Sequence, residues 1–196
     1  NLILRELVQH PDGTLGTCLI KELVPVQNTL REKAALESGA SGEYVQKRLP
    51  ISGNSVKIRI ERDRAYGNYG VIFQAGSKEA FEIRIEPALR TVGIYPVHSN
   101  LYFCPTKRVL QSVGGLEEGC LLEVNLKNDV LDMGINQDRT LICRLDRDYA
   151  DGESLSWYGF VKDGKAVFEV RGDIALRRTA SAEELLPLAH YGSDSV

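Results

Sequence analysis

The segment from Arg62 to Gly70, which reads RDRAYGNYG, holds the side chains best suited to chemistry at a surface. It combines two arginines, two tyrosines, an asparagine and two glycines. Arginine binds phosphates or a guanine edge, tyrosine stacks on bases, asparagine pairs with adenine, and glycine lets the backbone approach a ligand closely. The segment therefore predicts a nucleic-acid contact through Arg62, Arg64, Tyr66, Asn68 and Tyr69.

Two other interpretations of this segment stay open. As a connection between strands, it can pack its tyrosines on the sheet and pair Arg62, Asp63 and Arg64 with neighbouring charges. A loop rich in arginine and tyrosine also suits a contact with a protein partner.

A second candidate contact is Lys107-Arg108, within a short helix predicted over 105–113 and led by Pro105. A helix N-terminus attracts anions, so both side chains are placed to meet phosphates. Basic side chains that are simply exposed to solvent on a short helix are the simpler explanation.

The sequence contains no motif for catalysis, for a metal or for a cofactor. It lacks the nucleophile elbow, the P-loop and the dinucleotide fingerprint. The three histidines are scattered, and so are the four cysteines, which form no Cys-x-x-Cys pair. These cysteines are typical of buried thiols in a cytosolic protein. We expect no catalytic residue, no metal and no cofactor, and the balance is against an enzyme for this chain alone.

The strands that position these residues are predicted by alternation of apolar and polar residues. Alternation is clearest over 55–61 and 80–86, which predicts two half-buried strands. Further strands are expected over 69–74, 91–95, 120–126 and 140–145, and a hairpin over 155–170 is expected to turn at Asp163-Gly164. Arg59 and Arg84 alternate with glutamates, which predicts cross-strand ion pairs.

Helices are expected at the periphery. Thr29 with Glu32, and Ser181 with Glu184, have the spacing of a capping box, which predicts helices over 30–37 and from 181 onward. The predicted fold is mainly β with peripheral helices (α+β), around a barrel-like or strongly twisted antiparallel sheet. Its expected parts are a helical or mixed segment over 1–48, a β-rich core domain over 49–178, and a C-terminal helix and tail over 179–196.

Residues 100–126, which read NLYFCPTKRVLQSVGGLEEGCLLEVNL, give a strand, a proline-led short helix, a glycine stop, a Leu-x-x-Gly turn and a second strand. This order resembles the AbrB-type and plant B3-type DNA-binding barrels, including the B3-like recognition domains of some restriction endonucleases. The resemblance covers this segment only. It implies a β-barrel whose strand-connecting loops enter a DNA groove, and it identifies no base-reading residue.

Charge is unevenly distributed along the chain. The net charge is −3, but residues 47–108 contain 11 basic and 5 acidic residues, while residues 109–173 contain 7 basic and 13 acidic ones. A basic half on an acidic body favours a single binding face. Pairing of the two halves with each other explains the same distribution.

These observations lead to one main function and two alternatives. The main prediction is a DNA-binding recognition module, as in the target-recognition domain of a restriction or defence enzyme, with double-stranded DNA as partner and a fused catalytic domain or protein partner beside it. The first alternative is a non-catalytic protein-interaction or assembly domain. The second is a carbohydrate-binding or small-ligand-binding β barrel that uses Trp157 and the tyrosines, although Trp157 also suits the core.

The expected location is cytoplasmic, without a membrane partner. No apolar run approaches the length that spans a bilayer, and the N-terminal residues do not resemble a signal peptide.

Overall fold

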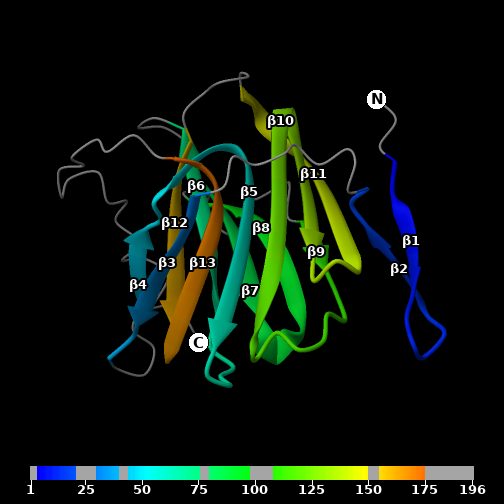
Figure 1. The fold of residues 1–196 in the computed structure, drawn as a ribbon, viewed down its shortest axis with the longest axis horizontal. Helices are drawn as coiled ribbons and strands as arrows, with labels where there is room; N and C mark the ends of the chain where they lie inside the picture. The colour runs from blue at the N-terminus through cyan, green and yellow to red at the C-terminus, as the bar shows by residue number, and fades with distance from the viewer. Residues whose placement is uncertain are drawn as a thin grey trace, which may run out of the picture.

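The described residues are almost entirely β-strand (Figure 1). The computed structural model describes residues 4–20, 30–39, 44–75, 80–97, 108–149 and 155–174. Apart from one turn of 3-10 helix, η2 (Pro87–Leu89), these ranges contain only strands and loops. They also contain no helix of the length and hydropathy needed to cross a membrane. The prediction of a mainly β fold is confirmed.

The strands form two antiparallel sheets and one separate hairpin. The five-stranded sheet has the order β11 (Arg139–Tyr149), β10 (Gly119–Ile135), β5 (Ile51–Arg62), β13 (Lys165–Ile174) and β3 (Leu30–Glu37). The six-stranded sheet has the order β4 (Tyr44–Arg48), β12 (Leu155–Lys162), β6 (Tyr69–Ala75), β7 (Ala80–Glu86), β8 (Thr91–Pro96) and β9 (Arg108–Leu110). The hairpin of β1 (Glu6–Gln9) and β2 (Leu15–Cys18) lies beside β11 (Figure 1).

The hydrophobic core lies between the two sheets. Because side chains alternate across a strand, β5 directs Val56, Ile58 and Ile60 inward, where each is at most 2% exposed. From the six-stranded sheet, Phe73 and Trp157 are fully buried, with their ring centres 5.2 Å apart. Burial of each such side chain contributes about 1.5–3 kcal/mol to folding. The result is a β-sandwich, whose core is made by the inner faces of two sheets.

The sheets do not close into a barrel. Among the described strands, β11 and β3 bound one sheet and β4 and β9 bound the other, and each of these four pairs with a neighbour on one side only. The prediction of a barrel is therefore wrong, because closure requires the end strands to pair with each other.

The described residues also do not support the predicted peripheral helices. Residues 30–37 form strand β3, which pairs with β13 along its length and buries Ala34 and Leu36 while Lys33 and Glu37 are exposed. This is a period of two residues, so the sheet contact outweighs the capping-box signal. In the helix predicted over 105–113, residues 108–110 form strand β9 and residues 105–107 lie outside the described residues. The helix predicted from 181 also lies outside the described residues.

The predicted turn at Asp163-Gly164 is present, but it does not close a hairpin within one sheet. Both residues have positive φ, 66° and 75°, as a tight turn with this dipeptide requires. The preceding strand, β12, pairs with β4 and β6, whereas the following strand, β13, pairs with β3 and β5. The turn therefore carries the chain from one sheet to the other.

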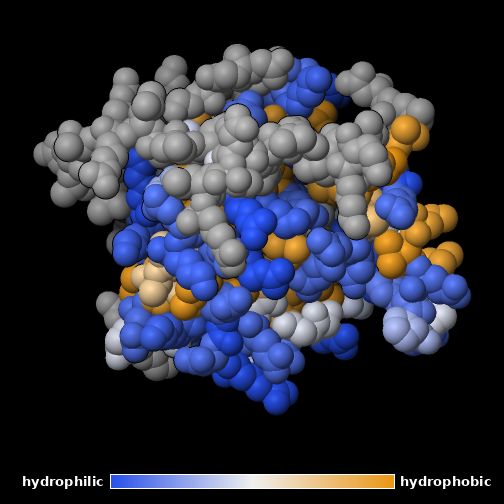
Figure 2. Space-filling model, in the orientation of Figure 1, coloured by the Kyte–Doolittle hydropathy of each residue, from blue (hydrophilic) through white to orange (hydrophobic). Residues whose placement is uncertain are grey.

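The outer face of the five-stranded sheet is mostly hydrophilic (Figure 2). It includes the ion pair between Lys57 of β5 and Glu123 of β10. These residues lie directly opposite each other in the strand pairing, where opposite charges stabilise a sheet. Apolar surface gathers instead on and beside the β1–β2 hairpin, where Leu4, Leu7 and Leu15 are 52%, 70% and 64% exposed.

Candidate functional site

Arg62, the first residue of the predicted nucleic-acid contact, is buried. It is 8% exposed, and its two terminal nitrogens donate to the backbone oxygens of Gly67 and Asp163, both at 2.6 Å. The guanidinium carbon lies 4.7 Å from the ring centre of Tyr69. Burial lowers the pKa of Arg62, although arginine keeps its charge in proteins. Arg62 therefore ties the loop after β5 to the turn between the two sheets.

Tyr69 makes an internal contact as well. Its side chain is fully buried, and its hydroxyl donates to the backbone oxygen of Leu116 at 2.8 Å. Burial raises the pKa of Tyr69, so its hydroxyl stays protonated and remains a hydrogen-bond donor.

The other described contact residues divide between the β5–β6 loop, which holds three of them, and strand β9. Arg64 is exposed and Tyr66 is 58% exposed, whereas Asn68 is half-buried just before β6. Arg108 is exposed on β9, and Lys107 lies outside the described residues.

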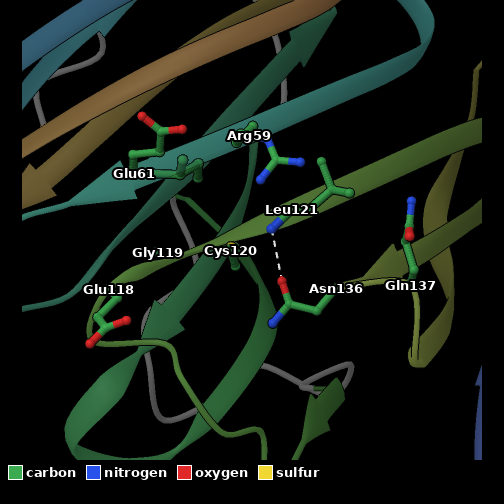
Figure 3. A pocket seen from close by; sticks show the side chains of 9 residues that line it. Arg59, Glu61, Glu118, Gly119, Cys120, Leu121, Asn136 and Gln137 are labelled. Carbon is green, nitrogen blue, oxygen red and sulfur yellow. Dashed lines mark hydrogen bonds between the residues drawn. The ribbon is translucent and has the colours of Figure 1, made fainter.

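An open pocket lies at one end of the five-stranded sheet (Figure 3). Its volume is about 340 Å³, at the lower end of the range for small-molecule sites. The lining residues come from β5, from the start of β10 with the residue before it, and from the β10–β11 turn: Arg59, Ile60, Glu61, Glu118, Gly119, Cys120, Leu121, Asn136 and Gln137. Strand pairing between β5 and β10 places Arg59 opposite Leu121 and Glu61 opposite Gly119.

The β10–β11 turn is fixed over the pocket by Asn136. Its side-chain oxygen accepts from the backbone nitrogen of Leu121 at 2.9 Å, and its own backbone nitrogen donates to the oxygen of Leu121, also at 2.9 Å. Asn136 and Gln137 both have positive φ, 52° and 62°. The two amide side chains lie on the same side of the pocket as Arg59 and Leu121, away from Glu61 and Glu118 (Figure 3).

Gly119 allows the close strand contact beneath the pocket. Its φ is 121°, and a Cβ at this position would lie 2.0 Å from the backbone oxygen of Ile60. Any larger residue would push β5 and β10 apart at the point where they form the floor of the pocket.

The charged side chains of the pocket make no ion pair or side-chain hydrogen bond with other described residues. Arg59, Glu61 and Glu118 are exposed, and within the described part of the chain none of them makes an ion pair or side-chain hydrogen bond. The cross-strand neighbour of Arg59 is Glu169, which instead contacts Arg171 at 3.4 Å and a lysine of β3. The predicted ion pair of Arg59 is therefore absent from the described residues.

A second polar cluster lies on the outer face of the six-stranded sheet. Glu82, which is 1% exposed, accepts two hydrogen bonds from Arg84 at 2.6 and 3.2 Å. The Arg84 guanidinium lies 4.4 Å from the ring centre of Tyr95, whose hydroxyl donates to Glu86 at 3.1 Å. Gly93 makes room for this stack, since a Cβ there would lie 2.6 Å from the ring of Tyr95.

Electrostatics favour the charged form of Arg84. Burial alone lowers the pKa of Arg84, but the hydrogen bonds and charge of Glu82 outweigh burial and raise it. Burial, followed by the charge of Glu86, raises the pKa of Tyr95 to about 12. Because its members satisfy one another and are largely buried, we assign this cluster to stability rather than to ligand contact.

Trp157 is not available to a ligand. It is fully buried, and its Nε1 donates to the backbone oxygen of Gly53 at 3.1 Å. Its expected place in the core is confirmed, and a ligand surface built on Trp157 is excluded.

Cysteines and metal ligands offer no further site within the described ranges. No group of three or more histidine, cysteine or acidic side chains there is arranged to hold a metal. Cys120 and Cys143 are buried and Cys18 is half-buried, while Cys104 lies outside these ranges. Burial raises the pKa of Cys120 to about 12, so its thiol stays protonated and unreactive.

The sequence matches no protein-family model and no curated protein. Its fold is similar to that of a Bacillus subtilis protein of unknown function with a galectin-like fold, with a TM-score of 0.51 and 12% identity over 89% of this chain and 100% of that chain. It is also similar to part of the Bombyx mori GH32 beta-fructofuranosidase, with a TM-score of 0.53 and 12% identity over 92% of this chain and 34% of that chain. The carbohydrate-binding module CBM66 of Bacillus subtilis matches with a TM-score of 0.44 and 11% identity over 88% of this chain and 91% of that chain. At these identities the two matches with TM-scores above 0.5 show a similarity of fold alone.

These findings correct the prediction of a DNA-binding, B3-like barrel from a restriction enzyme. The described strands form an open sandwich instead of a closed barrel, and the similar structures named above include a protein with a galectin-like fold and part of a beta-fructofuranosidase.

Proposed function

We propose that this protein is a carbohydrate-binding module that holds its ligand in the pocket between β5 and the β10–β11 turn. The observation that carries the proposal is the set of exposed hydrogen-bonding side chains around this pocket, whose charged members have no internal partner in the described structure.

These side chains suit the hydroxyl groups of a sugar. A hydroxyl group both donates and accepts, so a site that binds several of them needs donors and acceptors together. Arg59 supplies donors only, and Glu61 and Glu118 supply acceptors only. The amide of Gln137 supplies both, while Asn136 supplies its amide nitrogen, because its side-chain oxygen accepts from Leu121. Hydrogen bonds to the charged groups are the stronger ones, and together these groups fix the orientation of a small ligand.

The fold is compatible with this function. The fold is similar to that of a protein with a galectin-like fold and to part of a beta-fructofuranosidase. Fold alone does not decide function, so the proposal depends on the pocket.

The test is a glycan array followed by calorimetric titration of each positive glycan. The wild-type protein is compared with Arg59→Ala, which removes the pocket cation, and with Arg64→Ala, an exposed arginine outside the pocket. A hydrogen bond to a charged group contributes about 1.5–3 kcal/mol, so Arg59→Ala is expected to weaken binding by about tenfold or more.

Arg64→Ala is expected to bind like the wild type. Two results would overturn the proposal: no glycan binds the wild-type protein, or both variants bind every positive glycan with wild-type affinity.

A further inference from the structure

The charges of the pocket are unbalanced, and this bears on which sugars it takes. Its lining includes one cationic side chain, Arg59, and two anionic ones, Glu61 and Glu118. The ion pairs of this sheet face lie outside the lining, as with Lys57 and Glu123. A ligand therefore meets an excess of negative charge that no internal cation in the described structure neutralises.

The arrangement places the two carboxylates on different elements. Glu61 lies two residues after Arg59 on the same face of β5, about 7 Å along the strand, while Glu118 precedes β10. Both carboxylates line the pocket, so a ligand group inside it meets the negative potential of each. Arg59 lies nearer Leu121 and the amide side of the pocket (Figure 3).

Among the described residues that line it, the pocket has no aromatic platform. Its apolar lining consists of Ile60, Cys120 and Leu121, with no tyrosine, tryptophan or phenylalanine. Because these residues cannot stack on a sugar ring, they recognise a ligand by hydrogen bonds and by charge. The sign of the ligand's charge therefore affects its affinity strongly.

On the basis of the proposed function, we infer that this pocket ranks sugars by charge. An amino sugar with an ammonium group binds best, a neutral sugar binds less tightly, and a uronic acid binds least. The ammonium group donates to Glu61 and Glu118, whereas a ligand carboxylate is repelled by both and is attracted by Arg59 alone.

The experiment uses three matched probes, the methyl glycosides of glucosamine, glucose and glucuronic acid, titrated into the whole protein at low and at moderate salt. The expected result is at least a tenfold preference for the glucosaminide over the glucuronide at low salt, which decreases as salt screens the charges. Glu118→Gln, at an exposed position, is expected to reduce this preference by weakening the glucosaminide more than the glucoside. Arg59→Ala is expected to weaken all three probes and to weaken the glucuronide most.

Thermal unfolding of each variant verifies that the fold is intact. If the glucuronide binds as tightly as the glucosaminide while the glucoside also binds, the charge ranking is wrong and the proposed function stands. If none of the three probes binds and the glycan array is also empty, both the ranking and the proposed function fail.

Discussion

The buried guanidinium of Arg62 leads to a stability prediction that separates a structural role from a ligand contact. Arg62→Met keeps an apolar side chain of similar length and removes every donor. The structure loses two charge-assisted hydrogen bonds, to Gly67 and Asp163, and the stack on Tyr69. Each hydrogen bond is worth about 1.5–3 kcal/mol and the stack about 0.5–2 kcal/mol. Methionine carries no charge, so the variant avoids the cost of burying a cation, and this offsets part of the sum. We therefore expect the free energy of unfolding to fall by about 2–4 kcal/mol.

The assay is urea unfolding monitored by tryptophan fluorescence. Trp157 is the single tryptophan of the chain and is fully buried, so its emission reports loss of the core. For a chain of this size, about 2–4 kcal/mol corresponds to a decrease in Tm of roughly 5–12 °C. Arg64→Met is the control, because Arg64 is exposed and surface substitutions usually change stability by about 0.5 kcal/mol or less. Equal stability of the two variants would refute the structural role of Arg62.

Two further predictions concern backbone geometry and pH. Gly119→Ala is expected to destabilise the protein by more than Gly115→Ala does, because a Cβ at 119 meets a backbone oxygen whereas at 115 (φ 73°) it meets open space. Thermal unfolding of both variants checks this prediction, and equal decreases in Tm would contradict it. The raised pKa of Tyr95, about 12, means that the unfolded chain loses this proton first as pH rises. The free energy of unfolding that Tyr95 contributes below about pH 10 is therefore lost between about pH 10 and 12. Tyr95→Phe is expected to make the free energy of unfolding, measured by urea titration, fall less steeply with pH across this range. An unchanged dependence on pH would assign the alkaline loss to other groups.

Local alternation was sufficient to predict individual strands. The predicted strands over 55–61, 69–74 and 80–86 lie within β5, β6 and β7, because half-buried strands alternate apolar and polar residues. The partners of these strands were not predictable in the same way. β5 pairs with β10 and β13, which are far away in the sequence, and no local signal specifies such pairs.

The pocket was missed for the same reason. Arg59 alternates with glutamates on its own strand, which favours ion pairing, and only the pairing of β5 with β10 shows that Arg59 faces the turn at Asn136 and Gln137. The burial of Arg62 did have a sequence signal. Arg62 continues the inward positions of Ile58 and Ile60 on β5, so strand parity alone placed it on the core side.

The turn between the two sheets has a consequence for how the protein is made. Within the described strands, β3 pairs only with β13, and β4 pairs only with β12. The ribosome delivers the chain from its N-terminus at about 5–20 residues per second, so β3 and β4 emerge long before their partners. A nascent chain that stops before residue 155 lacks an interior strand in each sheet and exposes unpaired strand edges, which are sites of aggregation. Both sheets are therefore completed together, when residues 155–174 leave the ribosome.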